Sequence, residues 1–358
     1  MIHTHSIDEL PLKNAWLTIG IFDGIHRGHQ QILRPLVVGA HLADAPAVVL
    51  TFSPHPAVVL GGKKDFKYLT TPEERLALME SLGVDVVITQ TFDRAFADQT
   101  AGNFMRQVVQ ALGLSHLIIG YDTALGRGRE GDAARLTEIG EELGYTVQVI
   151  PPFSGENGVI SSTRIRESIT LGDVSSAAEG LGRYYSLSGL VVHGDGRGHR
   201  INIPTANISI PAGKVIPANG IYACWAWLES IIPLNEVGFD SNRKDAKITR
   251  PLRKDAPKYG PSVESASGHS LNGTKSISDK SGMKYLAATN VGVRPTFTPD
   301  LPAPAIEAHL LDFHLDIYGR QLRLEFVEYL RPEEKFETVE SLVDQIHRDI
   351  DLTREILT

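Results

Sequence analysis

Two histidines three residues apart, His26 and His29, form the clearest chemical pattern in the sequence. They follow a short apolar run at Trp16–Ile21 and a glycine turn, and they stand at the start of an amphipathic stretch at Gly28–Ala40. This order predicts a buried strand, a turn and a helix whose first N–H groups and positive dipole end can hold a phosphate. Imidazole groups at the same end can bind negative charge that develops on a phosphoryl group. The competing interpretation is that both histidines are ordinary polar turn residues.

A second phosphate-binding pattern lies in the second half of the chain, where glycines alternate with polar residues: Gly194, Gly196, Arg197 and Gly198. Backbone N–H groups of such a loop can approach a phosphate closely, although many hairpin loops have a similar composition. Soon afterwards, Thr205 and Asn207 stand two residues apart, so that on an extended chain a hydroxyl and an amide oxygen point the same way. Because Mg²⁺ binds oxygen atoms, we predict a metal and nucleotide site at this pair.

A single carboxylate, Glu307, stands among apolar residues in the strand-like run at Ile306–Phe313. From the spacing alone two interpretations stay open. The side chain is solvated on the outside of a strand, or it faces the mouth of a barrel and accepts the proton of an alcohol. Phosphoryl transfer to an alcohol depends mainly on Mg²⁺ and positioned phosphates, and a base adds modest help.

The composition narrows the classes of protein. With 358 residues, a hydrophobic fraction of 42% and a charged fraction of 22%, the chain is long enough for two globular domains. The net charge of −8 argues against broad binding of nucleic acid, though not against a small nucleotide in a local pocket. A single cysteine, Cys224, the lack of a leader pattern and the lack of an apolar run of roughly 20 residues predict a cytoplasmic protein with no membrane partner.

The first half alternates short apolar strands with amphipathic helices. We predict strands at Trp16–Ile21, Ala47–Phe52, Asp85–Gln90, Leu117–Tyr121 and Thr146–Ile150, and helices near Gly28–Ala40, Pro72–Leu82, Ala101–Leu112 and Asp132–Leu143. Such alternation is typical of an α/β, Rossmann-like domain, with a parallel sheet and helices on both faces. Ligands of these sheets bind beyond the carboxyl ends of the strands, where the histidine turn is expected.

The second half has a different texture. Short strands separated by Gly, Pro and Asn are predicted at Ser186–Val192, Ile221–Leu228, Lys284–Asn290, Ile306–Phe313 and Arg323–Tyr329, before one helix at Val339–Leu357. This pattern indicates a small antiparallel β-barrel with a terminal helix, and a boundary between domains 1–183 and 184–358. We interpret the polar segment at about 229–282 as a flexible insertion at a hairpin tip; a folded subdomain is the alternative.

Nine motifs in this order resemble one enzyme family over nearly the whole chain. They include Gly20-x-Phe22-Asp23-Gly24-x-His26-x-Gly28-His29, Phe52-Ser53-Pro54-His55-Pro56, Gly120-Tyr121-Asp122, Ser161-Ser162-Thr163-Arg164-Ile165-Arg166, Pro204-Thr205-Ala206-Asn207 and Asn290-Val291-Gly292-Val293-Arg294. The family that they resemble is the bifunctional bacterial riboflavin kinase/FAD synthetase.

The resemblance implies two reactions that use ATP and Mg²⁺. In the barrel, riboflavin becomes FMN, with Glu307 as the base, the glycine loop at the phosphates, and Mg²⁺ at Thr205 and Asn207. In the first domain FMN becomes FAD, with His26 and His29 as catalytic residues. There the resemblance places ATP or its phosphates at Gly20, Phe22, Asp23, Gly24, His26, His29, Asp122, Ser162, Thr163 and Arg166.

Three positions depart from the family pattern. Ile21 replaces an asparagine, Thr123-Ala124-Leu125 replaces Phe-x-Phe, and Asn202 replaces a glycine. The first two motivate an alternative in which the kinase is active and the nucleotidyltransferase is impaired or differently specific. A further alternative is a nucleotide-sensing regulator without turnover, against which the intact Glu307 and both histidines argue. The oligomeric state does not follow from the sequence.

Overall fold

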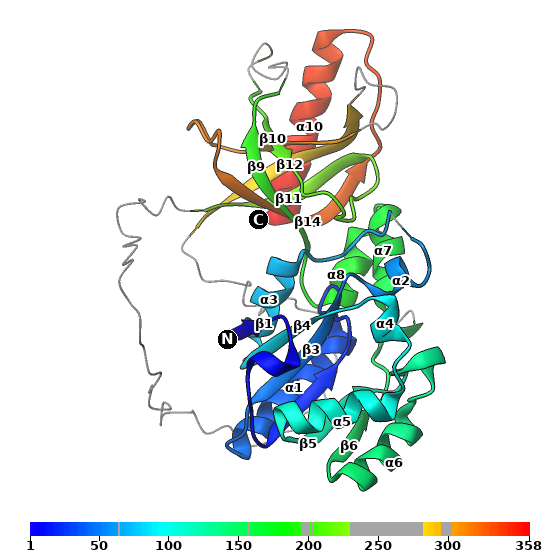
Figure 1. The fold of residues 1–358 in the computed structure, drawn as a ribbon. Coiled ribbons are helices and arrows are strands. Elements are labelled where there is room, and N and C mark those ends of the chain that lie inside the picture. Colours follow the sequence, from blue (N-terminus) through cyan, green and yellow to red (C-terminus); the bar gives the residue numbers. More distant parts are fainter. Residues whose placement is uncertain (64, 156–157, 195–200, 202, 230–281, 295–302) are drawn as a thin grey trace.

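The first half of the chain forms a six-stranded parallel sheet, which confirms the predicted α/β architecture (Figure 1). The structure is a computed structural model, and it describes residues 1–63, 65–155, 158–194, 201, 203–229, 282–294 and 303–358. The strand order is β1-β4-β3-β2-β5-β6, and every neighbouring pair is parallel. The strands are β1 Ile2–Thr4, β2 Ala15–Ile19, β3 Ala47–Ser53, β4 Val86–Thr91, β5 Leu114–Gly120 and β6 Thr146–Ile150.

Helices cover both faces of this sheet. They are α1 Arg27–Leu42, α2 Pro56–Val59, α3 Pro72–Ser81, α4 Arg94–Ala97, α5 Ala101–Leu112 and α6 Ala133–Leu143, with short 3₁₀ turns at Ile7–Glu9 and Arg127–Arg129. Successive residues of β3 alternate between the two layers, because Val49 packs with α1 and α3 whereas Val48 and Leu50 pack with α5. Thr71 is the N-cap of α3 and forms a capping box with Glu74.

The second half forms a closed antiparallel barrel of six strands, in the order β10-β13-β12-β11-β14-β9 (Figure 1). Its elements are β9 Tyr185–Val192, β10 Ala206–Ser209, β11 Gly220–Leu228, β12 Met283–Arg294, β13 Ala303–Leu310, β14 Gln321–Arg331 and the terminal helix α10 Val339–Leu357. The barrel and its helix are confirmed. Strands β11 and β12 pair from Leu228–Met283 to Gly220–Val291, as the hairpin interpretation requires. The proposed insertion lies outside the described residues, except at its two ends.

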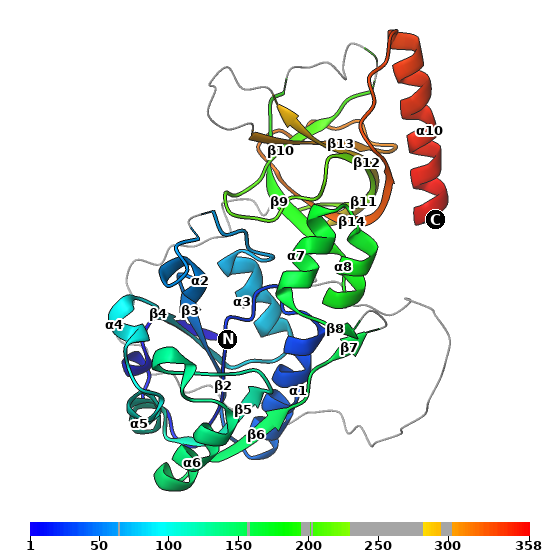
Figure 2. The ribbon, with the colours of Figure 1, turned by 90° about the vertical axis from the view of Figure 1, so that its right-hand side faces the viewer.

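Two helices and a short hairpin, which the sequence analysis did not separate, connect the two halves (Figure 2). The hairpin consists of β7 Ser154–Gly155 and β8 Gly158–Val159, and the helices are α7 Ser162–Thr170 and α8 Val174–Leu181. Buried residues of both helices, such as Ile169 and Leu181, belong to the same apolar cluster as the inward-facing residues of the barrel. The helices therefore pack with the domain that follows them. A boundary at residue 183 stays a prediction.

In the described part of the chain, no helix is both long and apolar enough to cross a membrane.

Candidate functional site

The turn after β2 has an unusual backbone. Phe22, Gly24 and Ile25 have positive φ values of 54°, 82° and 41°. Glycine adopts such angles freely, but a bulky or β-branched residue does so only where its surroundings enforce them. Both Phe22 and Ile25 are buried, at 3% and 1% exposure, so core packing holds the strained turn in place. This geometry ends the strand at Ile19, two residues before the predicted end.

Side chains from distant segments, together with one from the adjoining helix α1, hold the carbonyl groups of this turn. Their bonds are Arg75 Nη1 to Ile21 O at 2.8 Å, Ser162 Oγ to Asp23 O at 2.9 Å, Arg183 Nη2 to Gly24 O at 2.7 Å and Gln30 Nε2 to Ile25 O at 2.9 Å. Because the carbonyl oxygens are engaged by the protein, the turn is rigid before any ligand arrives. Rigid dipoles stabilise developing charge without a cost of reorganisation.

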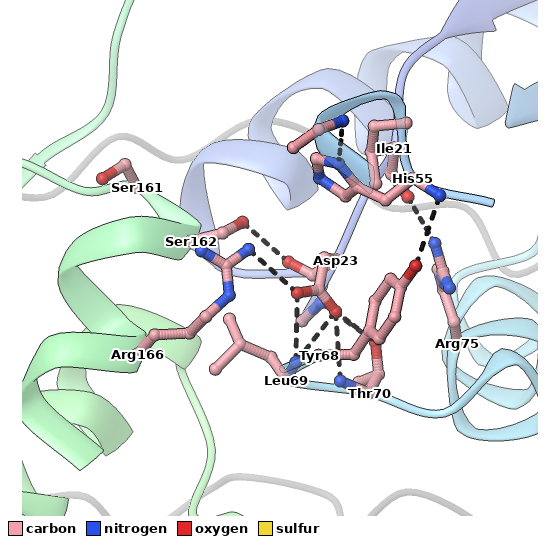
Figure 3. Close-up of polar contacts among 12 residues, drawn as sticks. Ile21, Asp23, His55, Tyr68, Leu69, Thr70, Arg75, Ser161, Ser162 and Arg166 are labelled. Atoms are coloured by element: carbon pink, nitrogen blue, oxygen red, sulfur yellow. Dashed lines mark hydrogen bonds and ion pairs between the residues drawn. The ribbon is translucent and has the colours of Figure 1, made fainter. Parts of the chain in front are cut away.

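The Asp23 carboxylate is the centre of the polar network in Figure 3. It is 1% exposed and accepts hydrogen bonds from Leu69 N, Thr70 N, Thr70 Oγ1 and Arg166 Nη2, all at 3.0 to 3.1 Å. Its oxygens are thus engaged with the protein, which favours a positioning role. The direct contact between Asp23 and ATP stays a prediction.

The two histidines stack on each other at the start of α1. Their ring centroids are 3.6 Å apart, and the His26 Nδ1 atom accepts the His29 N–H as the cap of the helix. That bond places the proton of the neutral His26 ring on Nε2, which is then a donor. Burial lowers the pKa of His26 to about 4 and the pKa of His29 well below its ordinary value. Both rings are therefore neutral hydrogen-bonding groups at neutral pH.

The N-terminus of α7 lies beside the same turn. Ser161 caps α7, and Ser162 donates to the Asp23 carbonyl, so that the ends of α1 and α7 both border the turn (Figure 3). Thr163 is exposed in the first turn of α7. Arg166 is held by Asp23, yet its buried Nε has no hydrogen-bond partner among the described residues. Two helix N-termini and an incompletely bonded guanidinium together can hold phosphate groups.

The remaining predicted residues of this site lie at the carboxyl ends of neighbouring strands. Gly20 follows β2, and the exposed Asp122 follows β5, which pairs with β2. Three site residues were not predicted individually: His55, Arg75 and Arg183. His55 stands in one of the recognised motifs, and burial and Arg166 lower its pKa to about 4. No local pattern marks the two arginines, because their partners are far away in the sequence.

In the barrel, strand register brings the predicted kinase residues together. Asn207 on β10 is the direct partner of Glu307 on β13, and Glu307 is also the partner of Asn290 on β12. These polar residues form one row across three strands. Gly194 lies so close to Asn207 that a Cβ atom at this glycine would overlap the amide side chain. The start of the glycine loop is therefore next to the row.

Glu307 alternates with Ile306 and Ala308, which are buried in the barrel core, so its half-buried side chain points away from the interior. Of the two interpretations that the spacing left open, this orientation favours the outward-facing one: Glu307 lies on the outer wall of the barrel, beside Asn207. Thr205 lies just before β10 and is half-buried. Gly196, Arg197, Gly198 and Asn202 lie outside the described residues.

The row has the chemistry of a magnesium site. The Asn290 Oδ1 atom is buried and has no partner within the described residues, and Asn207 and Thr205 add further oxygens nearby. Mg²⁺ prefers a few protein oxygens and completes its shell with water and phosphate. Among all the residues that the structure describes, no cluster of three His, Cys, Asp or Glu could hold a metal ion. A site rich in carboxylate or thiolate ligands is therefore not found in this part of the chain.

Each half of the chain matches a known protein family. Residues 9–164 match the family model of FAD synthetase, and residues 181–357 match that of riboflavin kinase. A crystal structure described as a macrolide-efflux protein from Streptococcus pneumoniae has a TM-score of 0.78 at 27% identity, covering 99% of this chain and 98% of that one. It shares the fold of both parts.

Two curated bifunctional riboflavin kinase/FMN adenylyltransferases extend the match to full length. The protein from Listeria monocytogenes is 31% identical, over 98% of this chain and 95% of the relative. The protein from Escherichia coli K12 is 32% identical, with the same coverage of 98% and 95%. Since both family models match in order and the similarity spans almost the whole chain, this chain belongs to the family of bifunctional riboflavin kinase/FMN adenylyltransferases.

Proposed function

We propose that the two sites described above divide the two reactions between them. The row of Asn207, Glu307 and Asn290 is the site where riboflavin is phosphorylated to FMN, and the turn at His26 and His29 is the site where FMN is adenylylated to FAD. The observation that carries this assignment is the pair of stacked, neutral imidazoles at the start of α1, next to a turn that is also contacted by Ser162 at the start of α7. Such an arrangement suits a site for charge on a phosphoryl group rather than a base for an alcohol.

In the adenylyl transfer, a phosphate oxygen of FMN attacks the α-phosphorus of ATP. A new P–O bond forms, the bond to the bridging oxygen breaks, and pyrophosphate leaves. The negative charge on the α-phosphoryl oxygens grows during the attack. His26 Nε2–H and the N–H groups at the starts of α1 and α7 stabilise this charge, and Arg166 and Thr163 bind the phosphates.

In the kinase reaction, the 5′-hydroxyl of riboflavin attacks the γ-phosphorus of ATP, and ADP leaves. Glu307 accepts the hydroxyl proton, while Thr205 and Asn207 hold the metal. When bound there, Mg²⁺ supplies positive charge that offsets the charge of the phosphates. The orphaned Asn290 oxygen supports a ligand at this position, which makes Asn290 a third candidate for the metal shell.

The departures from the family pattern leave the turn intact. Ile21 retains its backbone role, because its carbonyl accepts bonds from Thr51 and Arg75, and its side chain packs against the sheet core. Leu125 packs against the same core and pairs with Gly131 through its backbone. These contacts favour an active adenylyltransferase over an impaired one, and the same intact catalytic groups argue against a sensor without turnover.

One assay tests the proposal. The protein is incubated with riboflavin, ATP and Mg²⁺, and riboflavin, FMN and FAD are separated by chromatography. We expect FMN first and FAD afterwards, with both products lost when a chelator removes the metal. FMN without FAD would support the impaired transferase, and neither product would support the sensor. A cytoplasmic location stays a prediction from the single cysteine, because a reducing compartment suits unpaired thiols.

A further inference from the structure

A segment of the barrel half forms a backbone contact with the adenylyl-transfer half. The chain after β10 runs beside Tyr68: Tyr68 N donates to Gly213 O at 2.7 Å, and Val215 N donates to Tyr68 O at 3.0 Å. These two bonds form a parallel bridge between Tyr68 and Lys214. Residues 213–215 are thus an additional strand-like partner for the loop that holds Asp23.

Lys214 fixes this contact with a buried charge. Its side chain is 3% exposed, and Nζ donates to Leu69 O at 2.8 Å and to Glu74 Oε2 at 2.6 Å. Burial lowers the pKa of Lys214, and Glu74 acts in the opposite direction. A buried ammonium with two good acceptors is costly to disturb, because removal of either partner leaves a charge without compensation.

The Leu69 residue connects this lysine to the turn. Its carbonyl is bound by Lys214, its N–H donates to Asp23, and its side chain lies in the same apolar cluster as the barrel core. The next residue, Thr70, donates to Asp23 and accepts the Gly24 N–H at 3.0 Å. The position of these two residues therefore sets the position of Asp23 and Gly24, and with them the start of α1.

From this chain of contacts we propose that Lys214, a residue of the riboflavin kinase half, is a positioning residue for adenylyl transfer in the other half. The inference rests on the proposed assignment of that reaction to the His26 turn. Lys214 touches no reacting atom; it holds the 69–70 loop, which holds the turn. A second cation holds the same turn, since Arg183, two residues before the first barrel strand β9, donates to the Gly24 and Ile25 carbonyls.

The test compares Lys214→Met with Lys214→Arg in the full-length protein. Because a displacement of about 1 Å at a reacting centre can cost about 10²-fold in rate, we expect Lys214→Met to lower kcat for FAD formation from FMN by roughly 10- to 100-fold. The KM values and the rate of riboflavin phosphorylation should change by less than about threefold, and Lys214→Arg should recover most of the lost kcat. Lys284→Met is the matched control, because Lys284 is also a barrel lysine but its Nζ lies over Trp225, 3.3 Å from the ring centroid.

Hydrogen exchange at the amides of Leu69 and Thr70 supplies a readout that does not need turnover. Faster exchange at both amides in Lys214→Met, but not in Lys284→Met, supports the proposal. The proposal is wrong if folded Lys214→Met forms FAD at the wild-type rate, or if both activities fall together. A wild-type protein that forms no FAD would instead contradict the proposed function, and the exchange experiment would then decide the positioning role alone.

Discussion

The adenylyl-transfer site and the kinase site are built in different ways. The first is a strained turn whose groups are held by side chains from β3, α3, α7 and the segment just before β9. The second is a row of residues on three adjacent strands, aligned by backbone register. Long-range side-chain bonds determine the first site, whereas strand pairing determines the second.

This difference has a consequence for mutations. A side chain that is far from the turn in the sequence can disturb the first site, because most of the bonds that hold its carbonyl groups come from distant segments. In the barrel, the row is kept by ladder hydrogen bonds, which substitution of a single side chain leaves in place. Kinase activity should therefore depend on few side chains, and adenylyl transfer on many.

The largest effect is expected for a variant that impairs the barrel site alone. Glu307→Gln should lower riboflavin phosphorylation by about 10²- to 10⁴-fold, the usual cost of removing a positioned base. FAD formation from supplied FMN should continue at the parental rate, as measured by chromatography. Glu328→Gln is the control, since Glu328 is an exposed barrel carboxylate away from the row. Unchanged phosphorylation in a folded Glu307→Gln protein would refute the assignment.

The reciprocal variant should impair only the adenylyl-transfer site. His26→Ala combined with His29→Ala should accumulate FMN and form little FAD, because the loss of one preorganised donor already costs about 10²- to 10³-fold in rate. His41→Ala, at the exposed C-terminal end of the same helix, should leave both products unchanged. If the double variant made FAD at the normal rate, the histidines would be ordinary turn residues after all.

A smaller effect is expected for the buried carboxylate of the turn, Asp23. Asp23→Asn removes the negative charge and replaces one of the two oxygens that accept from four donors with an NH₂ group, so we expect a loss of about 1–3 kcal/mol in the free energy of unfolding and a partial loss of FAD formation. Kinase turnover of the folded protein should persist. Asp132→Asn provides the comparison, because asparagine caps α6 as well as aspartate does. Equal losses in both activities would contradict the separation of the two sites.

The last prediction concerns the dependence of folding stability on pH. His26 faces His29, Asp23, Arg166 and Arg183, and burial is the main cause that lowers its pKa to about 4. The unfolded chain then binds more protons than the folded chain between pH 6.5 and about 4, so folding stability decreases as pH falls through this window. The slope from this group is up to about 1.4 kcal/mol per pH unit. Titration of the imidazole by NMR, assigned with His26→Asn, measures the pKa. A midpoint near 6.5 would contradict the buried, neutral stack.

Much of the fold could be predicted from the sequence, because periodicity and stop signals are local. Helix α5 and helix α10 begin and end at the predicted residues, and the predicted strands all occur. The misses have physical causes. Strand β1 has three residues, too few to show a period, and α7 and α8 are short helices whose apolar faces match the barrel rather than the sheet. The predicted division into two domains does not indicate that α7 and α8 share an apolar core with the barrel.

The sequence by itself determined the chemistry of the sites: the paired histidines, the glycine turn, the Thr-x-Asn pair and the strand carboxylate. These depend on residue type and short spacing, which physical reasoning can interpret directly. Only the tertiary structure decided that Glu307 lies beside Asn207 on the outer wall, because register depends on pairing between distant strands. It also decided that Arg75, Arg183 and Lys214 hold the turn and its loop. These cations become positioning groups only because folding places them against carbonyl oxygens from other parts of the chain.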